Sequence, residues 1–143
     1  MKFLVTILMS LSILMAGCSS PTRYLRANEI LPIYETISPE LDVNEVRATI
    51  LSVASQKGWQ LESEDTVNHE IYLVQNRKEK LIAKIKIAYS SSGYQMYYVD
   101  SKGFKYDGEK IHKRFNRWVV SLNENIKQTL SDIKFNKSLQ KKI

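Results

Sequence analysis

The sequence has very little of the residues that build metal sites and covalent cross-links. It holds one cysteine and two histidines in 143 residues. A single cysteine excludes a disulfide within the chain, so the fold must be held by packing alone. The two histidines, His69 and His112, lie far apart and have no second cysteine to complete the ligand spacing of a zinc site. We therefore predict no metal and no cofactor.

Long apolar runs are also missing, apart from one at the N-terminus. Residues 3–16 are apolar except for one threonine and two serines. This run is shorter than the roughly 20 apolar residues that a membrane-spanning helix needs. It fits the apolar region of an export signal, which is about 7–15 residues long. We predict that residues 1–17 are a signal peptide.

The residues before the only cysteine resemble a lipobox, the signal read by the bacterial lipoprotein pathway: Leu14-Met15-Ala16-Gly17-Cys18. The resemblance implies that the thiol of Cys18 receives a diacylglyceryl group and that the signal is cut before it. One acyl chain holds a protein only marginally, whereas two give a stable anchor. The alternative is an ordinary signal peptide with an incidental cysteine. We expect lipidation at Cys18, and hence a membrane as partner.

Charge is distributed unevenly along the chain. The formal net charge is +6, and residues 101–143 alone hold 11 Lys or Arg against 4 Asp or Glu. Basic segments bind nucleic acid, anionic lipid or anionic polymer, or simply keep a protein soluble. Export argues against nucleic acid as a partner. It leaves anionic lipid, an envelope polyanion or an envelope protein.

The exported part has the length of one domain. Residues 19–38 contain two of the three prolines and show no clear period, so we predict a lipid-anchored tether over 18–41. Their scattered apolar residues also fit a segment that lies partly against the domain. We predict a globular domain over 42–134 and a basic C-terminal tail over 135–143.

The globular domain opens with a helix pattern. Asp42 followed by Glu45 is a capping-box pattern, and Gly58 is typical of a helix end. Between them, apolar residues recur at helical spacing: Val43, Val46, Ile50, Val53 and Ala54. We predict a helix over 43–57.

Four strand-like runs follow, at 59–64, 69–76, 80–89 and 94–101. In the third run, Lys84 and Lys86 alternate with apolar residues that share the opposite face. The connections are short and polar, which predicts hairpins and an antiparallel meander.

A long amphipathic helix is predicted over 109–133, where apolar residues recur in steps of three and four. The basic tail that follows has Phe135, Leu139 and Ile143 four residues apart. If helical, it fits an anionic membrane surface. A disordered end is the alternative that we favour.

The predicted order is therefore helix, four-stranded antiparallel meander, long helix. An antiparallel sheet usually buries one face and exposes the other. We predict a two-layer α+β domain with both helices on one sheet face.

Two stretches around the start of the predicted long helix stand out: Tyr97-Tyr98-Val99-Asp100-Ser101-Lys102-Gly103-Phe104-Lys105-Tyr106 and Ile111-His112-Lys113-Arg114-Phe115-Asn116-Arg117-Trp118-Val119. They resemble a group of small uncharacterised bacterial lipoproteins. The step Gly58-Trp59 is similar too. The resemblance spans about residues 42–122 and implies the same fold and anchoring without an activity.

Asp100, Ser101 and His112 are the best candidates for chemistry, because an Asp, a Ser and a His can form a nucleophilic triad. However, no nucleophile-elbow pattern surrounds Ser101. A turn at Asp100-Ser101 that bonds its own backbone, with His112 as a structural tie, is the simpler interpretation.

Tyr72, Lys84 and Lys86 are predicted on the uncovered sheet face, together with a tyrosine of the fourth strand. Tyrosine is enriched at interfaces, which makes these residues candidate partner contacts. The alternative is that they only solvate the face and keep the strands from pairing with other chains.

We therefore predict a non-enzymatic interaction or structural module of the cell envelope. The alternative is a hydrolase or small-ligand-binding protein that uses Asp100, Ser101 and His112. In a Gram-negative cell, Ser19 after the cysteine would favour the periplasmic side of the outer membrane. In a Gram-positive cell the same residues would place the protein on the outer face of the plasma membrane.

Overall fold

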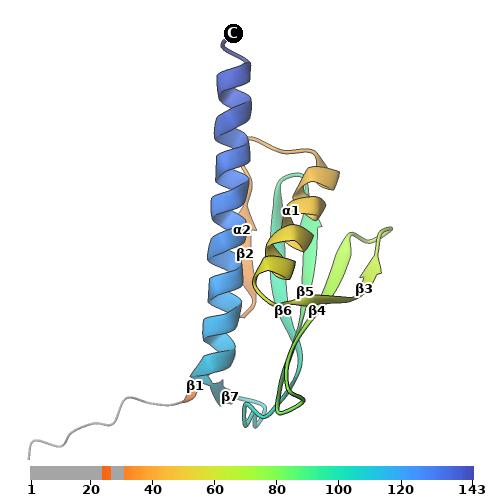
Figure 1. Cartoon of the computed structure of the whole chain (residues 1–143), viewed down its shortest axis with the longest axis vertical. Coiled ribbons are helices and arrows are strands. Elements are labelled where there is room, and N and C mark those ends of the chain that lie inside the picture. Colours follow the sequence, from red (N-terminus) through yellow and green to blue (C-terminus); the bar gives the residue numbers. More distant parts are fainter. Residues whose placement is uncertain (1–23, 27–30) are drawn as a thin grey trace, which may run out of the picture.

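The computed structural model describes residues 24–26 and 31–143. The predicted signal peptide and Cys18 lie outside the described residues. The elements, in chain order, are β1 (Tyr24–Arg26), β2 (Ile33–Thr36), α1 (Val43–Gln56), β3 (Gln60–Asp65), β4 (Glu70–Arg77), β5 (Leu81–Ser90), β6 (Gly93–Lys102), β7 (Lys110–His112) and α2 (Lys113–Gln140). Two helices and an antiparallel sheet confirm the predicted α+β class (Figure 1).

The main sheet has five antiparallel strands in the order β2-β6-β5-β4-β3. The four predicted strands match β3 to β6 to within one residue at each end. The prediction of four strands is nevertheless wrong, because Ile33–Thr36 of the predicted tether pairs with β6. Gly93 permits this pairing: a Cβ at that position would lie 2.4 Å from the backbone oxygen of Glu35.

A second, two-stranded sheet joins the start of the described chain to the region before α2. β1 pairs antiparallel with β7, with Tyr24 opposite His112. The backbone N–H of His112 also donates to the carbonyl of Phe104 at 2.9 Å. This small sheet fixes the place where the chain enters the domain.

α1 begins as the capping pattern predicts. The carboxylate of Asp42 accepts a hydrogen bond of 2.8 Å from the backbone N–H of Asn44. The helix ends before Gly58, whose φ of +85° suits glycine. Its buried side chains, such as Ile50, pack against the sheet, and the helix contacts β3 and β5.

α2 begins and ends later than predicted. Residues 110–112 are extended because they form β7, and Nδ1 of His112 caps the helix by accepting from the N–H of Arg114 at 3.2 Å. At the other end α2 continues to Gln140, so most of the predicted basic tail is helical and the disordered end that we favoured from the sequence is wrong. Lys137 forms an ion pair of 2.5 Å with Glu45, which holds this extension beside α1.

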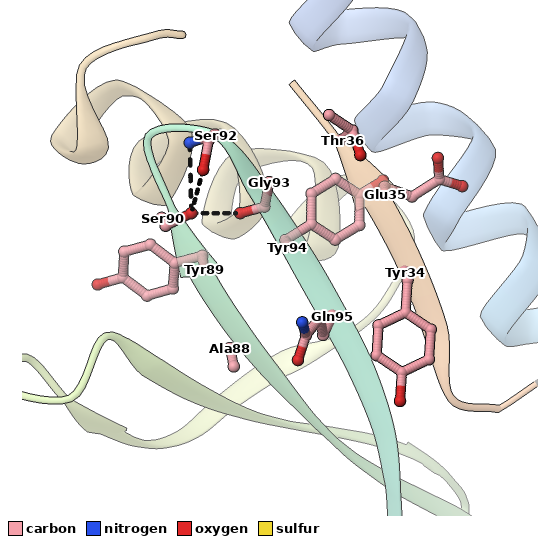
Figure 2. Close-up of a pocket in the computed structure, with 10 residues that line it drawn as sticks. All are labelled: Tyr34, Glu35, Thr36, Ala88, Tyr89, Ser90, Ser92, Gly93, Tyr94 and Gln95. Carbon is pink, nitrogen blue, oxygen red and sulfur yellow. Dashed lines mark hydrogen bonds between the residues drawn. The ribbon is translucent and has the colours of Figure 1, made fainter. Parts of the chain in front are cut away.

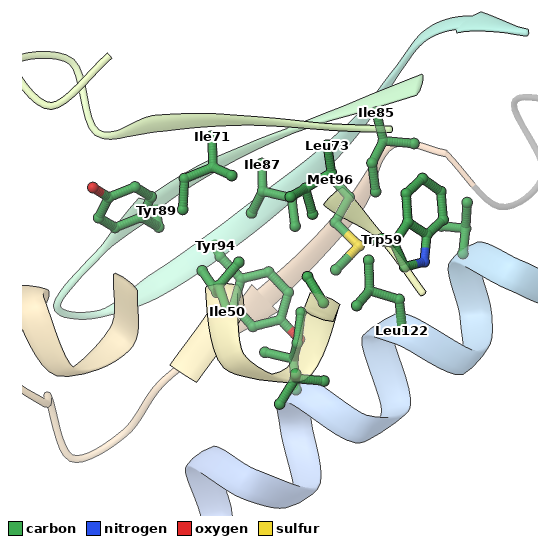
Figure 3. Packing of buried hydrophobic residues seen from close by; sticks show 14 of the residues in the cluster. Ile50, Trp59, Ile71, Leu73, Ile85, Ile87, Tyr89, Tyr94, Met96 and Leu122 are labelled. Carbon is green, nitrogen blue, oxygen red and sulfur yellow. The ribbon is translucent and has the colours of Figure 1, made fainter. Parts of the chain in front are cut away.

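The hydrophobic core combines side chains of the main sheet and of both helices. Figure 3 shows Ile50 of α1, Leu122 of α2 and Met96 of β6 in one cluster. Every buried hydrophobic residue of the described chain lies between Leu31 and Leu130. A chain that starts at Ser19 therefore keeps every buried hydrophobic residue of the described chain, and we expect it to fold without the preceding residues. None of the described helices is long and apolar enough to cross a membrane.

Candidate functional site

The candidate site is the sheet face opposite the buried side chains, which we call the outer face. On β5, Ile85 and Ile87 are buried, whereas Lys84 and Lys86 alternate with them and stay partly exposed. Register then fixes the neighbours, since Lys86 lies between Tyr72 of β4 and Tyr97 of β6. The outer face is defined by Tyr34, Glu62, Glu70, Tyr72, Lys84, Lys86, Gln95 and Tyr97.

The side chains in the middle of the outer face form one connected chain. Nζ of Lys86 donates to Glu70 at 2.9 Å and lies 5.2 Å from the centre of the Tyr97 ring. The hydroxyl of Tyr72 donates to the other oxygen of Glu70 at 3.1 Å. The rings of Tyr97 and Tyr34 meet edge to face at 6.4 Å. The contacts therefore run across β4, β5, β6 and β2.

Both lysines of the outer face are paired with carboxylates. Lys84 contacts Glu62 at 2.5 Å, as Lys86 contacts Glu70. The hydrogen bond to Glu62 raises the pKa of Lys84, and that to Glu70 raises the pKa of Lys86. The bond from Lys86 in turn lowers the pKa of Glu70. Two positive and two negative charges cancel, so the face offers an anionic polymer little net attraction.

A shallow hollow of about 330 Å³ adjoins this chain near the β5–β6 turn. Its lining includes the small residues Ala88 and Gly93, and Tyr34 and Gln95 line it from neighbouring strands (Figure 2). In the same view Glu35 points the other way, towards α2. The hollow gives a partner side chain a place to enter beside an exposed tyrosine.

The predicted polar cluster of Asp100, Ser101 and His112 does not come together as a triad. The hydroxyl of Ser101 lies 2.8 Å from that of Tyr98, and Asp100 accepts from the N–H of Ser101 at 2.8 Å. The ring of His112 caps α2 instead. Neither described hollow is lined by any of the three. The predicted turn at Asp100-Ser101 is wrong, because both residues lie within β6 and pair with Lys84 and Ala83 of β5.

Within residues 24–26 and 31–143, no group of three or more His, Cys, Asp or Glu is placed to hold a metal ion. The predicted lipidation site, Cys18, lies outside the described residues. It stays a prediction from the sequence.

Sequence reasoning placed Tyr72, Lys84 and Lys86 on one face with a tyrosine of the fourth strand, but it missed Tyr34 and the pairing of each lysine with a carboxylate. Tyr34 was assigned to the tether, because a four-residue strand between two prolines gives no clear period. Alternation did place Glu70 on the same face as Tyr72, and the burial pattern of β4 agrees. No known protein family model matches the chain, and no curated protein matches it.

Proposed function

We propose that the protein is a membrane-anchored bacterial lipoprotein whose outer face binds another protein of the cell envelope, without catalysis. The observation that carries the proposal is the connected chain Tyr34–Tyr97–Lys86–Glu70–Tyr72. It is an ordered, tyrosine-rich surface with no net charge of its own.

The chemistry of this face fits a protein partner better than a polyanion. Tyrosines provide large contact areas at low conformational cost and are enriched in protein interfaces. The ion pairs of Lys84 and Lys86 already neutralise the cations that a polyanion would need. Side chains that are ordered before binding also lose less entropy when they bind.

The arrangement of the helices supports this choice of face. We infer that both helices pack on the opposite side of the sheet, in a two-layer domain. Ile87 and Met96 lie side by side on the buried side, and Tyr94 of the same side bonds Asn123 of α2 at 2.7 Å. The outer face is then left for a partner.

The anchor in this proposal is the lipid on Cys18. Two acyl chains hold a protein stably at a bilayer. In a Gram-negative cell we place the protein on the periplasmic side of the outer membrane. The folded module would then be displayed to other envelope proteins at a fixed distance from the bilayer.

The experiment is co-purification of the native lipoprotein after mild cross-linking, with two matched variants. Tyr34→Ala with Tyr97→Ala removes two rings from the outer face. Phe135→Ala with Leu139→Ala is the control, because Tyr34 and Phe135 are equally exposed, at 63% and 62%. We expect the first variant to recover at least about tenfold less partner, as when an interface anchor is removed. The control should recover as much partner as the parent. A partner retained by the first variant contradicts the proposal.

A further inference from the structure

One end of the molecule gathers segments that are far apart in the sequence. The β4–β5 turn, the β6–β7 loop, β7 and the start of α2 all lie at the lower end of Figure 1. We call the exposed side chains of residues 77–80 and 102–117 the basal surface. Gly103 lies against the turn so closely that a Cβ there would be 2.1 Å from the oxygen of Lys80. The guanidinium of Arg77 lies 5.4 Å from the ring of Trp118.

The basal surface carries a strong positive charge. Its two segments hold nine Lys or Arg and three Asp or Glu, a net charge of +6. The whole chain also has a net charge of +6. The rest of the protein is therefore neutral overall, although residues 135–143 at the other end of α2 carry three further lysines. The nine cations are Arg77, Lys78, Lys80, Lys102, Lys105, Lys110, Lys113, Arg114 and Arg117.

These cations differ from the lysines of the outer face in how they are paired. Within the described chain, none of the nine forms an ion pair, and eight of them are exposed. Three of them, Arg77, Lys78 and Lys80, line a hollow of about 480 Å³. The positive charge of the basal surface is thus available to an external anion.

Aromatic side chains accompany the charge. Tyr106 is 39% exposed and its ring lies against that of Tyr98 in a tilted arrangement, with 4.6 Å between ring centres. Trp118 is partly exposed and packs edge to face on Phe104 at 5.1 Å. Tryptophan and tyrosine beside lysines and arginines are typical of surfaces that sit at the headgroup level of a bilayer.

The covalent chain places this surface near the predicted anchor. β1 pairs with β7 inside the basal region, and its first residue, Tyr24, lies only six residues after Cys18. Six residues cannot span more than about 22 Å. The 28 residues of α2 then extend away from this end for about 42 Å. A lipid on Cys18 would therefore hold the basal surface, and not the C-terminal end of α2, close to the bilayer.

We propose that the basal surface docks on the anionic phospholipid headgroups of the membrane. Attraction of this kind is strongest within a Debye length of the surface, about 8 Å at physiological salt. Docking would fix the orientation of the domain, with α2 directed away from the bilayer. The inference rests on the proposed anchoring for its setting, although the surface binds lipid by its own charge.

The test uses the chain from Ser19 onward, which keeps the whole core and lacks Cys18. Sedimentation with vesicles of phosphatidylcholine and phosphatidylglycerol is compared with pure phosphatidylcholine. We expect binding only to the anionic vesicles. Lys78→Gln with Lys105→Gln should weaken it roughly 30-fold, since each basic residue contributes separately at an anionic surface.

The matched control removes the same charge at the far end of α2, with Lys141→Gln and Lys142→Gln, and should bind as the parent does. Weaker vesicle binding by the control, with unchanged binding by the basal variant, would overturn the proposal. No binding to anionic vesicles would also overturn it, and binding to soluble polyphosphate alone would make the occupant a polymer. Because Cys18 and the outer face are untouched, failure here is distinguishable from failure of the proposed function.

Discussion

The hydroxyl of Tyr94 on β6 donates a hydrogen bond of 2.7 Å to Oδ1 of Asn123 on α2. The amide nitrogen of Asn123 in turn donates to a carboxylate oxygen of Glu35 on β2 at 2.8 Å. Burial raises the pKa of Tyr94 well above its ordinary value, so the hydroxyl keeps its proton and stays a hydrogen-bond donor. This short polar chain joins the edge strand β2, the neighbouring β6 and α2 at one point.

Replacing Tyr94 with phenylalanine should destabilise the fold. The change leaves Oδ1 of Asn123 buried without its donor, which costs about 1–2 kcal/mol. Urea unfolding followed by circular dichroism measures the loss. The control is Tyr97→Phe, because that hydroxyl bonds Gln95 on the exposed side and its removal should change little. Equal midpoints for the two variants would show that the Tyr94 bond contributes nothing.

Asn116 and Asn123 lie on the same helix, and the same substitution should act on them in opposite directions. Asn116 is 2% exposed, and within the described chain neither polar atom of its side chain has a hydrogen-bond partner. Asn116→Leu should therefore raise the free energy of unfolding by about 1 kcal/mol. This corresponds to a melting temperature about 4 °C higher. Asn123→Leu breaks two bonds and should lower it. Two shifts of the same sign would contradict this account of the helix.

The ion pair between Arg47 of α1 and Glu64 of β3 predicts a pH dependence. Nη2 of Arg47 donates to Glu64 at 2.7 Å, and a second bond runs between Nε and the other carboxylate oxygen. The bonds from Arg47 lower the pKa of Glu64. The contribution of this ion pair to the stability of the fold is therefore fully present above the ordinary carboxyl pKa of about 4.3. It is lost as the pH falls through the lowered pKa of Glu64.

Glu64→Gln should consequently unfold at a lower urea concentration than the parent at pH 7, and the difference should shrink as the solution is acidified. Glu40→Gln, the same change at an exposed position, is the control and should match the parent throughout. A difference between the Glu64 variant and the parent that persists unchanged into strong acid would rule out the ion pair as its source.

The two proposed surfaces should respond differently to salt. The ion pairs of Lys84 and Lys86 balance the charge of the outer face. Partner binding should therefore change less than threefold between about 50 and about 500 mM salt. Vesicle binding by the unpaired cations of the basal surface should fall more than tenfold over the same range. Surface plasmon resonance measures the partner binding, and sedimentation measures the vesicle binding. A partner released by salt would mean that charge, and not the tyrosines, dominates the outer face.

The centre of the main sheet was predictable because β4 and β5 alternate between buried and partly exposed side chains. On β5, Ile85 and Ile87 alternate with Lys84 and Lys86, which leaves only one face to bury. β2 and β7 were not predictable, since strands of four and three residues obtain their order from the partner strand and carry no period of their own. The end of α2 was missed because its last turns are held by contacts such as Lys137 with Glu45, which no local pattern encodes.

The candidate site was predictable only in part, for the same reason. Alternation put Tyr72, Lys84 and Lys86 on one side, but the pairing of each lysine depends on register across strands. Register brings Glu70 to Lys86 from the next strand, and Glu62 reaches Lys84 beside the irregularity between Leu61 and Ser63. The basal surface could not be predicted from the sequence, because residues 77–80 and residues 102–117 come together only when the sheet has formed.

The central claim is that a lipid on Cys18 holds this domain at a membrane. Mass spectrometry of the tryptic N-terminal peptide from protein made in its native cells tests it directly. We predict a peptide that runs from Cys18 to Arg23 and carries a diacylglyceryl group on the thiol. A peptide that still includes Met15 to Gly17, or an unmodified Cys18 thiol, would contradict the account.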